Sequence, residues 1–131
     1  MAHGLTTHLM FEGNAEKAMT FYVSLFPNSE IIQIDRYGPG EQGAEGSVRQ
    51  ASFTVAGQPL MCIDSPVSHN FTFTPAMSLL VDCESETELD EAFAKLAEGG
   101  AALMPPGDYG FSKKFGWVQD RFGVSWQLIL R

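Results

Sequence analysis

The feature that most constrains this chain is an internal repeat with an offset of 66 residues. Gly57 corresponds to Gly123 and Ile63 to Ile129 at that offset. Around these positions each half shows the same order of local patterns, in which a strand precedes a helix and three further strands follow. A repeat of this kind indicates one supersecondary module used twice. We therefore predict a single domain built from two similar modules, over about residues 5–65 and 75–131.

Apolar runs with turn signals place the strands, and capping signals place the helices. Asn14 is a candidate N-cap for the first helix, whereas Ser85 and Glu88 form a capping box for the second. The predicted strands span residues 5–11, 30–37, 47–55, 59–63, 78–81, 101–104, 115–119 and 124–130. This order predicts an α+β fold in which two βαβββ modules form a curved mixed sheet around a cleft, where a ligand would bind.

The composition excludes several classes of partner. The 131 residues include 16 Asp or Glu and 8 Lys or Arg, so the formal net charge is −8, and no basic run would attract a phosphate backbone. No apolar stretch approaches the roughly 20 residues that span a bilayer, and the first residues lack a signal-peptide pattern. We expect a cytoplasmic protein that binds neither nucleic acid nor membranes, with Cys62 and Cys83 reduced and buried.

Residues 38–43 match the pattern G-x-G-x-x-G of dinucleotide-binding proteins. That motif binds a pyrophosphate only where it joins a strand to a helix N-terminus. Here a β-branched run follows the glycines, and Glu41 and Glu45 would repel an anion. We predict that this segment is a loop with no nucleotide-binding role.

A set of short motifs extends along nearly the whole chain. They are Phe11-x-Gly13-Asn14-Ala15-Glu16, Phe21-Tyr22, Phe26-Pro27, Gly46-Ser47, Phe71-x-Phe73 and Asp120-x-Phe122-Gly123-Val124-Ser125-Trp126-Gln127. Their order and spacing resemble the PhnB-like branch of the vicinal oxygen chelate superfamily, which includes glyoxalases, bleomycin resistance proteins and dioxygenases. The resemblance implies the two-module fold, a small-molecule ligand and a homodimer.

Members of this branch often carry the label 3-demethylubiquinone 3-methyltransferase-like. A methyltransferase needs a Gly-rich strand-to-helix turn for its cofactor, usually in a doubly wound sheet. Neither predicted helix follows such a turn. We therefore do not expect the activity that this label suggests.

Metal-dependent members of the superfamily hold a divalent ion with four His, Glu or Gln side chains, two from each module. The resemblance places these positions at Thr7, Met61, Ala76 and Gln127. This set lacks the three or four imidazole or carboxylate ligands that a first-row ion prefers, so we predict no metal and no other cofactor. A shift of one residue in the first strand would bring His8 into the cleft, which leaves His8 and Gln127 as candidate ligands if a metal does bind.

Strand alternation, phased so that Gln127 faces the cleft, defines the candidate ligand site and turns Trp126 and Leu128 toward the helix. A four-residue turn would pair Val118 with Ser125 and Trp117 with Trp126, and this pairing predicts that both tryptophans pack in the core. The predicted cleft is apolar with a few polar points. Its residues are Thr7, Leu9, Phe11, Met61, Ile63, Ser78, Ser125, Gln127 and Ile129.

Three hypotheses for the function fit these residues. The first is a protein that binds an apolar or weakly polar small molecule in the cleft without the usual metal. The second is a metal-dependent enzyme of the lyase, isomerase or dioxygenase type, and the third is a folded dimer whose cleft is filled by its own side chains. The sequence shows no nucleophile beside a base, and His69 has no carboxylate at a spacing that suits a general base.

Overall fold

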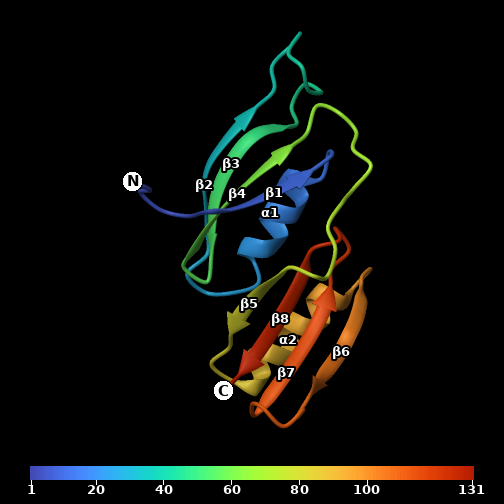
Figure 1. Ribbon diagram of the computed structural model, residues 1–131. Coiled ribbons are helices and arrows are strands. Elements are labelled where there is room, and N and C mark those ends of the chain that lie inside the picture. Colours follow the sequence, from blue (N-terminus) through green and yellow to red (C-terminus); the bar gives the residue numbers. More distant parts are fainter. The chain divides into compact units, whose positions relative to one another are not determined.

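The computed structural model describes residues 1–131 and divides them into two compact units, Met1–His69 and Asn70–Arg131, called unit 1 and unit 2 below (Figure 1). The predicted order βαβββ is confirmed in both. The elements of unit 1 are β1 (Thr7–Phe11), α1 (Ala15–Val23), β2 (Glu30–Arg36), β3 (Val48–Val55) and β4 (Gln58–Asp64). Those of unit 2 are β5 (Ser78–Asp82), α2 (Glu86–Ala97), β6 (Ala101–Gly107), β7 (Lys114–Gln119) and β8 (Ser125–Leu130).

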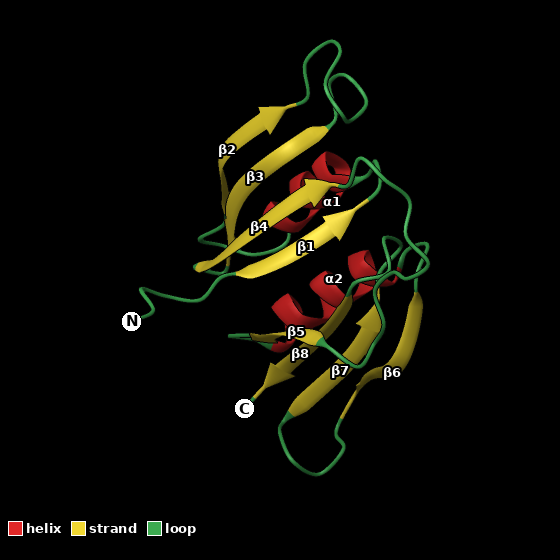
Figure 2. Ribbon diagram, turned by 45° about the horizontal axis from the view of Figure 1, so that its top comes forward, coloured by secondary structure: helices red, strands yellow, loops and turns green.

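Each unit consists of one four-stranded mixed sheet with one helix against one of its faces (Figure 2). The strand order is β1-β4-β3-β2 in sheet 1 and β5-β8-β7-β6 in sheet 2. The first and last strands of each unit pair in parallel, and all other neighbours pair antiparallel. The predicted α+β class is thus confirmed. We call the face of each sheet that its helix does not cover the open face.

The core of unit 1 lies between α1 and sheet 1. Met19 and Tyr22 are fully buried on α1, at the three-residue spacing that places two side chains on one helix face. Phe53, Leu60 and Cys62 are buried on the strands that α1 contacts. Period-2 burial along β3 and β4 therefore identifies the helix-covered face of sheet 1.

The core of unit 2 has the same construction. Trp126 and Leu128 of β8 are fully buried, as predicted, and α2 contributes Leu89 and Phe93 on its buried face. The β7 backbone comes close to the helix at Gly116, where a Cβ atom would lie 2.8 Å from the Phe93 ring. Glycine at this position therefore lets α2 pack directly on the sheet.

Both cysteines are free and buried, as the sequence predicts. Burial, followed by the charge of Asp64, raises the pKa of Cys62 to about 12. Burial also raises the pKa of Cys83 to about 12, with smaller contributions from Glu88 and Asp82. Both thiols are therefore protonated at neutral pH, which makes them poor nucleophiles and poor metal ligands.

Helix α1 is capped by a residue that the local pattern does not identify. Asn14 occupies the N-cap position, but its side chain makes no capping hydrogen bond. The carboxylate of Asp64, at the end of β4, instead accepts hydrogen bonds from the backbone N–H groups of Gly13 at 2.8 Å and Ala15 at 2.9 Å. Its other oxygen accepts from Val48 N at 2.9 Å. The predicted capping role of Asn14 is therefore wrong.

The two capping residues predicted for α2 are confirmed, with the return bond one residue earlier than the N-cap N–H that a capping box uses. Ser85 Oγ accepts a hydrogen bond from Glu88 N at 3.1 Å, and the Glu88 carboxylate reaches back to accept from Glu84 N at 2.8 Å. Helix α2 is the longer of the two, with 12 residues. Neither helix has the length and apolar character needed to cross a membrane.

The β7–β8 hairpin differs from the predicted register by one residue. Asp120 N donates to Val124 O at 2.9 Å, so the loop contains three residues, and Gly123 adopts a φ of 96°. A three-residue loop with Gly at the positive-φ position is a common hairpin geometry. Trp117 consequently pairs with Gln127 rather than with Trp126. The prediction that both tryptophans pack in the core is wrong for Trp117, which lies half-buried on the open face.

The prediction that Thr7, Leu9 and Phe11 share a face with Met61 is also wrong. In the parallel pairing of β1 with β4, the residue beside Met61 is His8. Side chains alternate between the faces of a strand, and Leu9 and Phe11 are buried on the face that α1 covers. Apolar residues occupy both phases of this strand, so the alternation alone could not select one of them.

Candidate functional site

The open face of sheet 2 brings together polar and aromatic side chains from three strands. Ser78 of β5 pairs in register with Ser125 of β8, and Gln127 of β8 pairs with Trp117 of β7. Ser125 and Gln127 are two positions apart on β8, so they point to the same face. Three of the predicted site residues, Ser78, Ser125 and Gln127, therefore lie together. We call them, with Trp117, the polar strip.

Hydrogen bonds connect the four members of the polar strip. The indole Nε1–H of Trp117 donates to Ser125 Oγ at 2.8 Å, and Gln127 Nε2 donates to Ser78 Oγ at 3.2 Å. The hydroxyls of Ser78 and Ser125 lie 2.7 Å apart, so one of them donates to the other. Since Ser125 is only 1% exposed, these bonds satisfy a buried hydroxyl. The network thereby fixes the position of the Gln127 amide.

One acceptor of the polar strip remains available. Gln127 uses Nε2 within the strip, whereas its Oε1 accepts no hydrogen bond from any residue of the chain. The side chain is half-buried, so Oε1 is within reach of a molecule on the open face. The strip therefore offers one hydrogen-bond acceptor to a ligand that carries an O–H or N–H donor.

Apolar side chains border the polar strip on the same face. Leu80 pairs in register with Gln127 and is 52% exposed, and Ile129, another predicted site residue, pairs with Phe115. The exposed ring of Phe111 meets Phe115 edge-on at a centroid distance of 5.0 Å. We call Leu80, Phe111, Phe115 and Ile129 the apolar shelf.

Tyr109 holds the loop that carries Phe111. Its ring stacks on Phe111 at 6.4 Å and contacts Phe115 edge-on at 6.1 Å, and its hydroxyl donates to Pro105 O at 2.6 Å. Aromatic contacts in these geometries contribute beyond the burial of area. The apolar shelf is therefore a supported surface rather than a single exposed ring.

The open face of sheet 1 has a more polar character. One row of register crosses all four strands and contains His8, Met61, Ser52 and Gln33. The predicted residue Ile63 lies two positions beyond Met61 on β4, on the same face. A shallow cavity of about 250 Å³ opens here; its lining residues are Gln33, Asp35, Gln50, Ala51, Ser52 and Met61.

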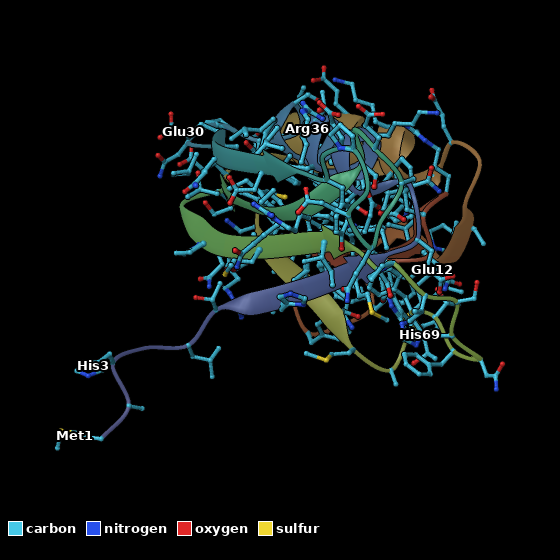
Figure 3. All side chains as sticks on the ribbon, turned by 90° about the horizontal axis from the view of Figure 1, so that it is seen from above. Met1, His3, Glu12, Glu30, Arg36 and His69 are labelled. Atoms are coloured by element: carbon cyan, nitrogen blue, oxygen red, sulfur yellow. The ribbon has the colours of Figure 1, made fainter.

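His69 lies in the segment that follows β4, where Figure 3 labels it. Its Nε2 is 2.9 Å from Ser65 Oγ, and the same oxygen is 2.9 Å from Val67 O. The single hydroxyl hydrogen of Ser65 can serve either acceptor, so the tautomer of His69 decides the direction of the His69–Ser65 bond. The pair is a local contact within the segment that follows β4.

The donor set on these faces does not fit a divalent metal ion. Nowhere in the chain do three or more His, Cys, Asp or Glu side chains converge. On sheet 1 His8 lies beside Met61, and on sheet 2 Gln127 lies beside Leu80. Ala76 precedes the first residue of β5. A first-row ion prefers three or four imidazole or carboxylate ligands, and neither sheet presents them.

The helix N-termini do not fit a cofactor that binds through an anionic group. At α1 the N–H groups of Gly13 and Ala15 already donate to the Asp64 carboxylate. At α2 Glu88 N donates to Ser85 Oγ, and Glu84 N, just before the helix, donates to the Glu88 carboxylate. An incoming phosphate or carboxylate would meet a carboxylate of like charge at either N-terminus. The glycines of residues 38–43 lie in a loop between β2 and β3, as predicted.

Comparison with known proteins places the chain in a family. The family model described as 3-demethylubiquinone-9 3-methyltransferase matches residues 3–129. The chain belongs to this family. The predicted resemblance to its PhnB-like members is confirmed, because a PhnB protein from Bacillus cereus, described as a 3-demethylubiquinone-9 3-methyltransferase, is 62% identical. The TM-score with that structure is 0.95, over 98% of this chain and 100% of that chain.

Two further relatives show how far the family fold extends. Protein YjdN from Escherichia coli (strain K12) is 24% identical over 95% of this chain and 92% of its own length. FosX, a fosfomycin resistance protein from Listeria monocytogenes in complex with Mn(II) and sulfate, has a TM-score of 0.67 at 17% identity, over 100% of this chain and 94% of its own. The likeness to FosX shows the fold alone, which is of the glyoxalase/bleomycin resistance type.

Four residues of unit 2 are not predicted as site residues from the sequence, namely Trp117, Leu80, Phe111 and Tyr109. Trp117 was assigned to the wrong face because the hairpin loop was counted as four residues. Gly123 was the available signal, since a Gly at the third loop position favours a three-residue loop. The apolar residues of the 108–113 loop carry no periodic pattern, so only the structure places them on Phe115.

Proposed function

We propose that this member of the 3-demethylubiquinone-9 3-methyltransferase family binds an apolar or weakly polar small molecule on the open face of sheet 2. In this proposal the polar strip supplies the acceptor Gln127 Oε1, the apolar shelf supplies the contact area, and no divalent metal takes part. The protein acts in the cytoplasm as a homodimer. The proposal concerns binding and assigns no reaction, since the helix N-termini and the open faces do not fit the groups that the family name and fold imply.

The observation that carries the proposal is the balance of polar and apolar groups on this face. Within the polar strip the Trp117 indole N–H, one N–H of the Gln127 amide and one of the two serine hydroxyl hydrogens are used, whereas Gln127 Oε1 accepts no hydrogen bond. Exposed Leu80 and Phe111 lie on the adjoining apolar shelf. Binding sites for small molecules are largely apolar with a small number of placed polar groups, and this face has that composition.

Phenol and anisole test the acceptor, because they differ mainly in one O–H donor. We expect phenol to bind about fivefold more tightly than anisole, since one neutral hydrogen bond contributes roughly 0.5–1.5 kcal/mol. The measurement is a ¹H–¹⁵N NMR titration that follows the indole N–H signals. Trp117 should shift on ligand addition. Trp126 is fully buried and donates to Asp120 at 2.9 Å, so its signal serves as an internal reference.

Two leucine variants complete this test. Gln127→Leu should abolish the advantage of phenol while anisole affinity stays within about twofold, because the variant removes the acceptor Oε1, and the Nε2–Ser78 bond that it also removes lies within the strip. Gln58→Leu, at the exposed start of β4, should change neither affinity. Equal affinities of phenol and anisole for the unmodified protein would contradict the role of Gln127. A Trp117 signal that no probe moves would instead support the hypothesis of a filled, non-functional face.

The placement of His8 on the open face of sheet 1 favours one alternative, a metal-dependent lyase, isomerase or dioxygenase-type enzyme. An imidazole there is a better metal ligand than the threonine first assigned to that position. We expect protein purified without chelators to contain less than about 0.1 equivalents of zinc, nickel, iron or manganese by elemental analysis, because no set of three suitable ligands converges. A stoichiometric metal that is lost in His8→Ala would support the alternative.

A further inference from the structure

The cavity on the open face of sheet 1 differs in chemistry from the site proposed on sheet 2. Four of its lining side chains are polar, namely Gln33, Asp35, Gln50 and Ser52. The thioether of Met61 forms the apolar part, and Ala51, whose side chain belongs to the core, contributes backbone. A volume of about 250 Å³ lies just below the range of roughly 300–1,000 Å³ that is typical of small-molecule pockets. The cavity therefore suits a molecule of fewer than about ten non-hydrogen atoms.

Strand register explains why these side chains converge. Asp35 pairs with Gln50, and Gln33 pairs with Ser52, with no irregularity between the two pairs. Positions two apart on a strand share a face and are separated by roughly 7 Å. The cavity thus has an acidic end at Asp35 and Gln50 and a neutral polar end at Gln33 and Ser52. Met61 pairs with Ser52 and adjoins the neutral end.

The carboxylate of Asp35 has no cationic partner. The nearest arginines in the sequence are engaged elsewhere, because Arg36 pairs with Glu16 at 2.6 Å and Arg49 pairs with Glu41 at 3.0 Å. No salt bridge and no hydrogen bond of the chain involves the Asp35 side chain. Side-chain oxygens of its three polar neighbours can also accept hydrogen bonds. The Asp35 carboxylate therefore leaves one negative charge without a cationic partner, beside amide and hydroxyl groups that can both accept and donate.

We propose that this cavity binds a short aliphatic primary ammonium compound with a hydroxyl group at its other end. The ammonium group donates to the Asp35 carboxylate and the Gln50 amide oxygen, and the hydroxyl group pairs with Ser52 and Gln33. The carbon chain between them lies against Met61. Charge favours this class of ligand twice, through Asp35 and through the net charge of −8, which raises the local concentration of cations. The site lies on the other sheet and does not depend on the function proposed above.

The test compares 4-amino-1-butanol with 1,4-butanediol and butylamine. The amino alcohol carries both polar groups at a separation that suits the two ends of the cavity, whereas each control lacks one of them. We expect NMR titration to show shifts at the backbone amides of residues 33–35 and 50–52 and at the side-chain amides of Gln33 and Gln50. The amino alcohol should bind roughly tenfold more tightly than the diol, because a hydrogen bond to a charged group contributes more than a neutral one. Added salt should weaken its binding.

Matched variants distinguish the effect of the Asp35 carboxylate from that of the protein's overall charge. Asp35→Asn should weaken the binding of 4-amino-1-butanol roughly tenfold and leave the affinity for 1,4-butanediol unchanged. Glu30→Gln removes the same charge from the same strand, outside the cavity lining, and should change affinity by less than about twofold. Gln50→Leu provides a second variant at the acidic end and should weaken the binding of 4-amino-1-butanol. Because position 50 is exposed, this substitution should leave the fold unchanged.

Three results would overturn the proposal. They are equal binding of amine and diol, an Asp35→Asn variant that binds the amine as tightly as the unmodified protein, and shifts scattered over acidic residues of both units. Because the shifts expected here lie in unit 1, whereas the phenol test observes Trp117 in unit 2, the failure of either site is visible independently of the other.

Discussion

Replacement of Asp64 by Ala is expected to lower the free energy of unfolding by roughly 3–5 kcal/mol. The carboxylate is only 3% exposed and accepts hydrogen bonds from three backbone N–H groups, those of Gly13, Ala15 and Val48. Hydrogen bonds to charged groups contribute about 1.5–3 kcal/mol each, and an unsatisfied buried donor costs a similar amount. Partial hydration of the donors in the variant keeps the expected sum below three full bonds. Urea unfolding followed by far-ultraviolet circular dichroism measures the loss.

Asn14→Ala is the matched control for this variant. Asn14 occupies the N-cap position of the same helix, but its side chain makes no capping bond, so its loss should cost less than about 0.5 kcal/mol, below the usual cost of losing a cap. If Asn14→Ala destabilises the protein as much as Asp64→Ala, the carboxylate is not the cap of α1. Trp fluorescence is not a suitable probe here, because both tryptophans lie in unit 2.

For α1 the start of the helix could be predicted from the sequence, but the side chain that caps it could not. Local preference correctly located the helix start, because Asn, Asp, Ser and Thr are favoured at that position. The side chain that performs the capping comes from β4, some 50 positions away, and it reaches α1 only because β4 pairs with β1 and aligns Asp64 with Phe11. A non-local contact of this kind depends on strand register. At α2 the whole capping box is local, and the prediction was correct.

Register also decided for which of the proposed site residues the face was predicted correctly. The order of elements, the core positions Trp126 and Leu128, and the shared face of Ser78, Ser125 and Gln127 followed from patterns in single strands. The errors at Thr7, with its neighbours on β1, and at Trp117 were shifts of one residue, and such a shift moves every side chain of a strand to the other face. In β1 apolar residues lie on both faces of the strand, so alternation does not select the buried face. In the β7–β8 hairpin the loop has three residues instead of the predicted four, which shifts the pairing by one residue.

The hydrogen bonds of Asp120 link this register to the candidate site. Its Oδ1 accepts from Phe122 N at 2.8 Å and from Val124 N at 3.0 Å, within the loop that Asp120 closes. Its Oδ2 accepts from the indole Nε1–H of Trp126 at 2.9 Å. One buried carboxylate thus defines the loop length and anchors the next strand to the core. The loop length in turn places Trp117 opposite Gln127.

Asp120→Ala is therefore expected to reduce the free energy of unfolding by roughly 3–5 kcal/mol, because three donors around a side chain that is 3% exposed lose their acceptor. Asp120→Asn should cost less, since an amide oxygen can still accept from the loop while its NH₂ group opposes one of the remaining donors. Urea unfolding followed by tryptophan fluorescence suits both variants, because Trp117 and Trp126 lie in the affected hairpin.

The control is Asp108→Ala, where a carboxylate in an exposed loop accepts a hydrogen bond from Gly110 N at 2.8 Å. The loss of this bond should lower the free energy of unfolding by less than about 1 kcal/mol. An Asp120→Ala variant as stable as Asp108→Ala would show that the hairpin holds its register without the carboxylate, and the placement of Trp117 would then rest on Gly123 and strand pairing alone.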